Sequence, residues 1–145
     1  MSVALNSDYK IVEQGGGRYK ATYTINKNLV PSELEVDLVT TCIIHVSEDS
    51  WTITSWFTEE KYKHHGYGTE LLWILLHTLK HIYGTPQTVK YIWNGANQYV
   101  YDFLVEHFDA KCTTPIAVQK YQTEDDWSSH IYVLDVNKFK EYFNL

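Results

Sequence analysis

The stretch from residue 59 to residue 72 most constrains what this chain can fold into, because Gly66 and Gly68 stand there between two apolar segments. Residues 51–58 are rich in β-branched and aromatic side chains, which is typical of a strand. The order therefore predicts a strand, a glycine loop and the start of a helix. Such a junction can bind a phosphate, since glycines admit close approach and a helix N-terminus carries partial positive charge. A lone pair of glycines is more often only a tight turn.

Composition limits the classes of protein to which the chain can belong. Its 145 residues suit one domain, and the 44% hydrophobic content excludes disorder. A net charge of −6 argues against binding to a nucleic-acid backbone. No apolar run reaches the roughly 20 residues of a membrane span, and the N-terminus lacks the pattern of a signal peptide. We therefore expect a soluble, cytoplasmic protein, which for a phage-encoded chain means the host cytoplasm.

Two cysteines, Cys42 and Cys112, are too few for a disulfide framework and lack metal-ligand spacing. They are expected to be buried free thiols in a reducing compartment.

Before the glycine loop, the pattern predicts strands. Residues 9–12 and 18–26 form a hairpin around a triple glycine, and residues 34–46 form one long strand or two shorter ones. The apolar positions change parity near Val39, which predicts a bulge or bend. The strand at 51–58 has aromatic residues at both parities, which predicts a central strand that is covered on both faces.

After the loop, leucines recur at helical spacing until Gly84, which is typical of a helix C-cap. A strand at 89–93, a helix at 97–108, strands at 116–121 and 131–136, and a helical turn at 137–143 are predicted next. A strand, helix and strand joined by one short crossover form a right-handed unit, so the strands that start at Trp51 and Val89 are expected to be parallel neighbours.

The glycine loop resembles motif A of the GNAT superfamily of acyl-CoA-dependent N-acyltransferases. Tyr62, Lys63, Gly66 and Gly68 match its tyrosine, its Arg/Gln position and two of its glycines, and the leucines at 71–72 match its helix. The resemblance covers about residues 50–136. It implies an α/β (α+β) fold with a mixed, mostly antiparallel sheet, a central parallel strand pair splayed around the cofactor, and two main helices. The whole chain, 1–145, would be one domain: a β meander (1–49), an acetyl-CoA-binding core (50–110), and a strand pair with a short helix (111–145).

The resemblance also implies acetyl-CoA as cosubstrate. Backbone around the glycines would bind the pyrophosphate, and the edge of the preceding strand would pair with the pantetheine amides, with an Asn at the next helix start as a further contact. Asn97 is the better match for this pantetheine contact, and Asn94 is the alternative. The cofactor-binding residues so implied are Phe57, Thr58, Lys63, His64, His65, Gly66, Tyr67, Gly68, Thr69 and Asn97.

The chain departs from the family pattern at the catalytic positions. Phe103 stands where many members have a tyrosine that protonates the leaving thiolate, so Tyr101 or Tyr99 is the candidate general acid. Thr52 stands near the position where members often have a glutamate. The region before Trp51 also shows no pair of helices, so the substrate site is the part that transfers least. Three acidic residues in a later loop could attract a cationic amine, although such a run is more often only solvated: Glu124, Asp125 and Asp126.

Histidines raise the question of a metal site. His77 and His81 share a helix face, and His64 and His65 are adjacent, but neither pair has a further ligand at suitable spacing. No metal is expected. His45, on a strand, could accept a proton but more often such a histidine is half-buried and hydrogen-bonded.

The leading hypothesis is an N-acetyltransferase that moves an acetyl group from acetyl-CoA to a primary amine, either a small cationic amine or a protein lysine or N-terminus. The alternative is a non-catalytic GNAT-fold module that binds CoA or a protein partner. Neither nucleic acid nor membrane is an expected partner, and exposed strand edges leave a homodimer open.

Overall fold

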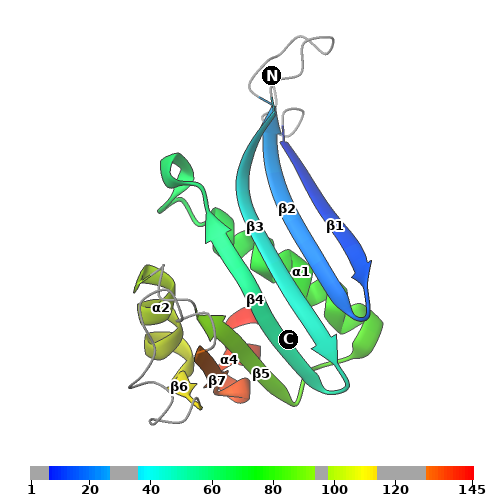
Figure 1. The fold of residues 1–145 in the computed structure, drawn as a ribbon, viewed down its shortest axis with the longest axis vertical. Helices are drawn as coiled ribbons and strands as arrows, with labels where there is room; N and C mark the ends of the chain where they lie inside the picture. The colour runs from blue at the N-terminus through cyan, green and yellow to red at the C-terminus, as the bar shows by residue number, and fades with distance from the viewer. Residues whose placement is uncertain (1–6, 27–35, 94–97, 114–129) are drawn as a thin grey trace.

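The computed structural model describes residues 7–26, 36–93, 98–113 and 130–145, and they form one seven-stranded mixed sheet with helices (Figure 1). The strand order is β1-β2-β3-β4-β5-β7-β6. The strands are β1 (Ser7–Gly15), β2 (Arg18–Asn26), β3 (Val36–Ser47), β4 (Ser50–Thr58), β5 (Thr88–Trp93), β6 (Lys111–Cys112) and β7 (His130–Leu134). The helices are η2 (Glu60–Tyr62, a 3-10 turn), α1 (Tyr67–Tyr83), α2 (Gln98–Phe108) and α4 (Val136–Phe143).

Most elements lie where the sequence places them. The hairpin, the long helix that ends before Gly84 and the last helix are confirmed. The parity change is a bulge in β3: Tyr23 pairs with Thr40 and Thr24 pairs with Leu38, so Val39 is the extra residue. The two-residue strand β6 was not predicted, and the strand predicted at 116–121 lies outside the described residues.

The interpretation of β4 as a strand covered on both faces is wrong, although its central position is confirmed. Ile43 pairs with Ser55 and Ile44 pairs with Ile53, so Thr54 is bulged. This second bulge changes the parity of β4, and Trp51 and Trp56 are both buried while Phe57 is 41% exposed.

β4 and β5 form the expected parallel pair, joined through α1. Their pairing runs from Ser50↔Thr88 only to Ile53↔Tyr91, whereas β4 continues to Thr58. The two strands therefore separate toward their C-terminal ends, as the fold prediction requires.

The hydrophobic core lies on one face of the sheet. Buried apolar residues of the strands pack on α1, which contributes Leu71, Leu72, Leu75, Leu76 and Leu79. Figure 1 shows α1 and α4 behind the sheet. Cys42 is a buried free thiol in this core, as expected, and Cys112 is half-buried. Among the described helices, none is long and apolar enough to cross a membrane.

Thr41 provides a first test of this packing. Its side chain is 3% exposed, and its Oγ1 is a buried polar atom without a hydrogen-bond partner in the described structure. Because a buried hydroxyl without a partner costs about 1–3 kcal/mol, Thr41→Val should raise the free energy of unfolding by about 1 kcal/mol in urea titrations.

The neighbouring Thr40 is the matched control. Its Oγ1 donates to the Phe57 carbonyl oxygen at 2.8 Å and accepts from Thr58 Oγ1 at 3.2 Å. Thr40→Val should therefore lower stability by about 1 kcal/mol or more. Equal losses in the two variants would contradict the assignment of Thr41 as an unpaired hydroxyl.

Candidate functional site

The start of α1 presents backbone N–H groups that no helix bond uses. Gly66 is the N-cap, with φ 81°, and it has no side-chain cap. The first N–H bonded to the preceding turn is that of Glu70, which donates to the Gly66 carbonyl oxygen at 3.0 Å. The N–H groups of Tyr67, Gly68 and Thr69 therefore lack acceptors in the described structure. His64 also has positive φ, 67°, so the loop turns sharply twice before the helix.

Gly68 allows this helix start to lie against β4. Trp56 Nε1 donates to the Gly68 carbonyl oxygen at 2.9 Å. A Cβ at position 68 would lie 2.9 Å from Thr58 Oγ1 and 3.3 Å from Trp56 Nε1. The second glycine of the motif is thus needed for close packing, whereas Gly66 is needed for its left-handed backbone.

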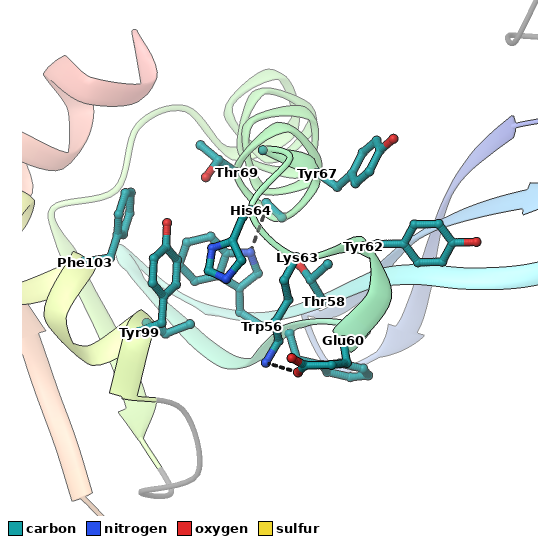
Figure 2. Close-up of a pocket in the computed structure, with 14 residues that line it drawn as sticks. Trp56, Thr58, Glu60, Tyr62, Lys63, His64, Tyr67, Thr69, Tyr99 and Phe103 are labelled. Atoms are coloured by element: carbon teal, nitrogen blue, oxygen red, sulfur yellow. Dashed lines mark hydrogen bonds and ion pairs between the residues drawn. The ribbon is translucent and has the colours of Figure 1, made fainter.

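A cavity of about 340 Å³ opens at this junction. Figure 2 shows its lining side chains, which come from the end of β4, the loop, the start of α1 and one side of α2. β4 contributes Trp56, Phe57 and Thr58, and α2 contributes Tyr99, Val100 and Phe103. The cavity therefore lies where β4 and β5 separate.

The edge of β4 that faces away from β3 is open along this cavity. Thr58, Phe57 and Trp56 pair with β3 on one side, but beyond Ile53 no described strand pairs with β4 on the other. An extended ligand with amide groups can hydrogen-bond to such an edge.

Two charged side chains of opposite sign, Lys63 and Glu60, line the cavity. Lys63 Nζ lies 2.9 Å from Glu60 Oε2, and the hydrogen bond from Lys63 lowers the pKa of the Glu60 carboxyl. The Glu60 side chain is 89% exposed, so this ion pair is weak and an anion in the cavity can compete for the ammonium group.

The two tyrosines proposed as general acids lie in different places. Tyr99 lines the cavity and packs edge-on against His64, with ring centroids 5.5 Å apart (Figure 2). Tyr101 packs against Tyr132 at 5.6 Å and is not among the lining residues. Phe103, one turn after Tyr99, packs against Trp56 at 5.7 Å. Of the two candidates, Tyr99 is the one at the cavity.

Some of the remaining predicted residues line the cavity and others do not. Eight of the implied cofactor contacts line the cavity: Phe57, Thr58, Lys63, His64, Gly66, Tyr67, Gly68 and Thr69. His65 packs against Tyr67, with ring centroids 6.0 Å apart, and is not a lining residue. Asn97, its alternative Asn94, and the acidic residues Glu124, Asp125 and Asp126 lie outside the described residues.

Five lining residues were not predicted as contacts: Trp56, Glu60, Tyr62, Val100 and Phe103. Trp56 could have been found, because it shares a strand face with Thr58 at i, i+2.

Two other histidines, His77 and His45, contact backbone carbonyl oxygens. His77 Nε2 lies 2.7 Å from the Phe143 carbonyl oxygen, and His45 Nε2 lies 2.9 Å from the Gly16 carbonyl oxygen. Within the described ranges, no group of three His, Cys, Asp or Glu side chains could hold a metal ion.

Comparison with known proteins finds similarity in structure but not in sequence. No family model and no curated protein matches the sequence. The structure is similar to a GNAT family acetyltransferase from Elizabethkingia anophelis, crystallised with acetyl-CoA bound, with a TM-score of 0.54 and 10% identity over 89% of this chain and 95% of that one. It is also similar to Ard1 from Thermoplasma volcanium, with a TM-score of 0.52 and 17% identity over 79% of this chain and 67% of that one. The predicted GNAT fold is confirmed.

Proposed function

We propose that this chain is an N-acetyltransferase that uses acetyl-CoA as cosubstrate and a primary amine as acceptor. The observation that carries the proposal is the cavity at the separation of β4 and β5, which has the open β4 edge on one side and the uncapped start of α1 on the other. The bound acetyl-CoA of the Elizabethkingia anophelis structure supports the choice of ligand.

The residues present fit the chemistry of this ligand. The free N–H groups of Tyr67, Gly68 and Thr69 and the Lys63 ammonium suit a pyrophosphate. The open edge at Phe57 and Thr58 suits the two amides of pantetheine. Acetyl-CoA then supplies the activated acetyl group.

The transfer forms a C–N bond between the amine and the acetyl carbon and breaks the C–S bond of the thioester. Negative charge develops on the carbonyl oxygen, and a backbone N–H of β4 between Trp56 and Thr58 would stabilise it. The amine loses a proton, and the sulfur leaves as a thiolate that takes one up. We assign Tyr99 as the donor of the second proton, because its phenol group lies at the cavity and Phe103 cannot donate.

The acceptor is a small cationic amine, or a lysine or N-terminus of a protein. The acidic loop residues Glu124, Asp125 and Asp126 remain the proposed attraction for its charge. The proposed site of action is the cytoplasm.

Calorimetry with acetyl-CoA tests the proposal directly. Binding in the micromolar range is expected, and absence of binding at about 1 mM, an affinity weaker than about 4 kcal/mol, would contradict it. If acetyl-CoA binds, thiol release over a panel of amines then measures transfer.

A non-catalytic CoA-binding module is the second candidate, and Phe103 at the cavity favours it because that ring replaces the proton donor. This candidate predicts acetyl-CoA binding without thiol release for any amine in the panel.

Tyr99→Phe should lower kcat by about tenfold and leave KM for acetyl-CoA within about twofold. The effect is moderate because Tyr99 is 64% exposed and water can protonate part of the thiolate. Tyr101→Phe is the matched control, since that ring packs against Tyr132, and it should leave kcat unchanged. Equal losses in the two variants would remove Tyr99 from its assigned role.

A further inference from the structure

The sheet face opposite the helices is open in the described structure. On β2 and β4, the residues that alternate with the buried ones are half-buried or exposed. On β3, Ile43 and His45 are half-buried on this face, whereas Thr41, opposite Thr22 and Phe57, is buried. Figure 1 shows this face of β1–β4 turned toward the viewer, with α1 on the far side and no described helix in front of it. We call it the open face.

The open face is basic, although the chain as a whole is acidic. The strand register places five cations on it: Lys10 opposite Thr22, Arg18 opposite His45, Lys20 opposite Ile43, and Lys90 and Lys111 on either side of Val133. The only acidic strand residue that the register places there, within the described ranges, is Asp8, opposite Thr24. The face therefore carries +4 in a chain of net charge −6, so the rest of the chain sums to −10.

Within the described ranges, these five cations form no ion pair, although Lys111 is close enough to Asp109 to help lower the pKa of that carboxyl. Among the described residues, the ion pairs of lysines are formed by Lys61, Lys63 and Lys138, which lie in the loop and on α4. Arg18 Nε donates to the neutral Gln14 side chain at 2.9 Å. The charge of the open face is thus available to a partner.

Between the cations, the open face is uncharged and partly apolar. Its middle is formed by Thr22, Ile43, Thr52 and Phe57 around the buried Thr41, with Val12 toward the β1 edge. Five strands about 4.8 Å apart and about 30 Å long span roughly 700 Å². This approaches the about 800 Å² that each partner contributes to a standard protein interface, and an apolar centre with a charged rim is the usual arrangement of such interfaces.

We propose that the open face is a docking surface for a protein with an acidic surface. A second copy of this chain docking through the same face would bring like charges together. A nucleic acid is disfavoured because the cations do not form a row, and Phe57 is the one aromatic side chain that the register places on the described part of this face. The proposal does not depend on the proposed function. Phe57 also lines the cavity, so a docked protein would lie beside it.

Fluorescence anisotropy with a labelled glutamate-rich peptide of about twenty residues, at low ionic strength, tests the charge complementarity. Lys20→Glu and Lys90→Glu together should weaken binding of this peptide by about tenfold or more. The control is Lys140→Glu. Lys140 lies on α4, away from the open face, and each Lys→Glu substitution changes the charge by the same amount. This control should change binding by less than about twofold.

Three results would overturn the proposal: no binding of the peptide at about 1 mM, an equal effect of Lys140→Glu and Lys20→Glu, or tighter binding of a DNA duplex with the same number of charges. The last result would assign the face to nucleic acid. Circular dichroism checks folding, and if the Glu variants do not fold, Lys20→Gln and Lys90→Gln remove the same positive charges and are measured in their place.

Discussion

Gly66→Asp is expected to weaken acetyl-CoA binding by more than about hundredfold while the chain stays folded. A Cβ at this position meets nothing within 4 Å, so the carboxylate would stand in open space at the start of α1. At about 5 Å from a phosphate and an effective dielectric constant of about 20, the repulsion is about 3 kcal/mol. Stability should change little, because Asp tolerates a positive φ better than most residues and is favourable at an N-cap.

Gly66→Asn separates charge from shape. Asn has nearly the size of Asp and tolerates the same backbone, where φ is 81°, but it is neutral. It should weaken binding, measured by calorimetry, by about tenfold or less. Equal affinities of the Asp and Asn variants would mean that the phosphates do not lie at Gly66, and a urea titration of both variants shows whether lost binding reflects unfolding.

The sequence was sufficient to identify this loop but not to explain both of its glycines. Gly66 and Gly68 belong to one pattern, yet Gly66 is required for its backbone angle and Gly68 for the contact between α1 and β4. The angle follows from local geometry, as sequence patterns do. The contact depends on where Thr58 and Trp56 point, and the bulge at Thr54 decides that.

The strands also combine a feature that the local sequence predicts with one that depends on tertiary contacts. The parity change at Val39 predicted the bulge in β3 because apolar residues mark both sides of it. In β4, Ile53 and Trp56 also differ in parity, but Phe57 follows directly and suggests a second covered face instead. Only pairing with β3, a tertiary contact, distinguishes these two explanations.

The position of the proposed general acid was partly predictable. Tyr99 and Phe103 are four residues apart on α2, so they share a helix face, and Tyr101 does not. The sequence left both tyrosines as candidates, and the cavity lining distinguishes them. The acceptor site was not predictable, because the acidic loop 124–126 has no pattern that fixes its position relative to the cavity.

Gly68→Ala is expected to lower the free energy of unfolding by about 2 kcal/mol. The new methyl group would lie 2.9 Å from Thr58 Oγ1, so the start of α1 or the Thr58 side chain must move. That movement would also weaken the hydrogen bond from Trp56 Nε1 to the Gly68 carbonyl oxygen. Because Ala is the better helix former by up to about 1 kcal/mol, the measured loss is a net value. Urea titration followed by tryptophan fluorescence measures it.

A double-mutant cycle with Thr58→Ala decides whether close packing is the cause. Removing Oγ1 takes away the nearest atom, so Thr58→Ala with Gly68→Ala should lose about 1 kcal/mol less than the sum of the single variants. Gly66→Ala is the control: it has space but a φ of 81°, so it should cost about 1 kcal/mol that Thr58→Ala does not recover. If the cycle is additive at Gly68, the steric explanation of the second glycine is wrong. The glycine would then be present for the close approach of a ligand to the backbone, and Gly68→Ala should reduce acetyl-CoA binding more than stability.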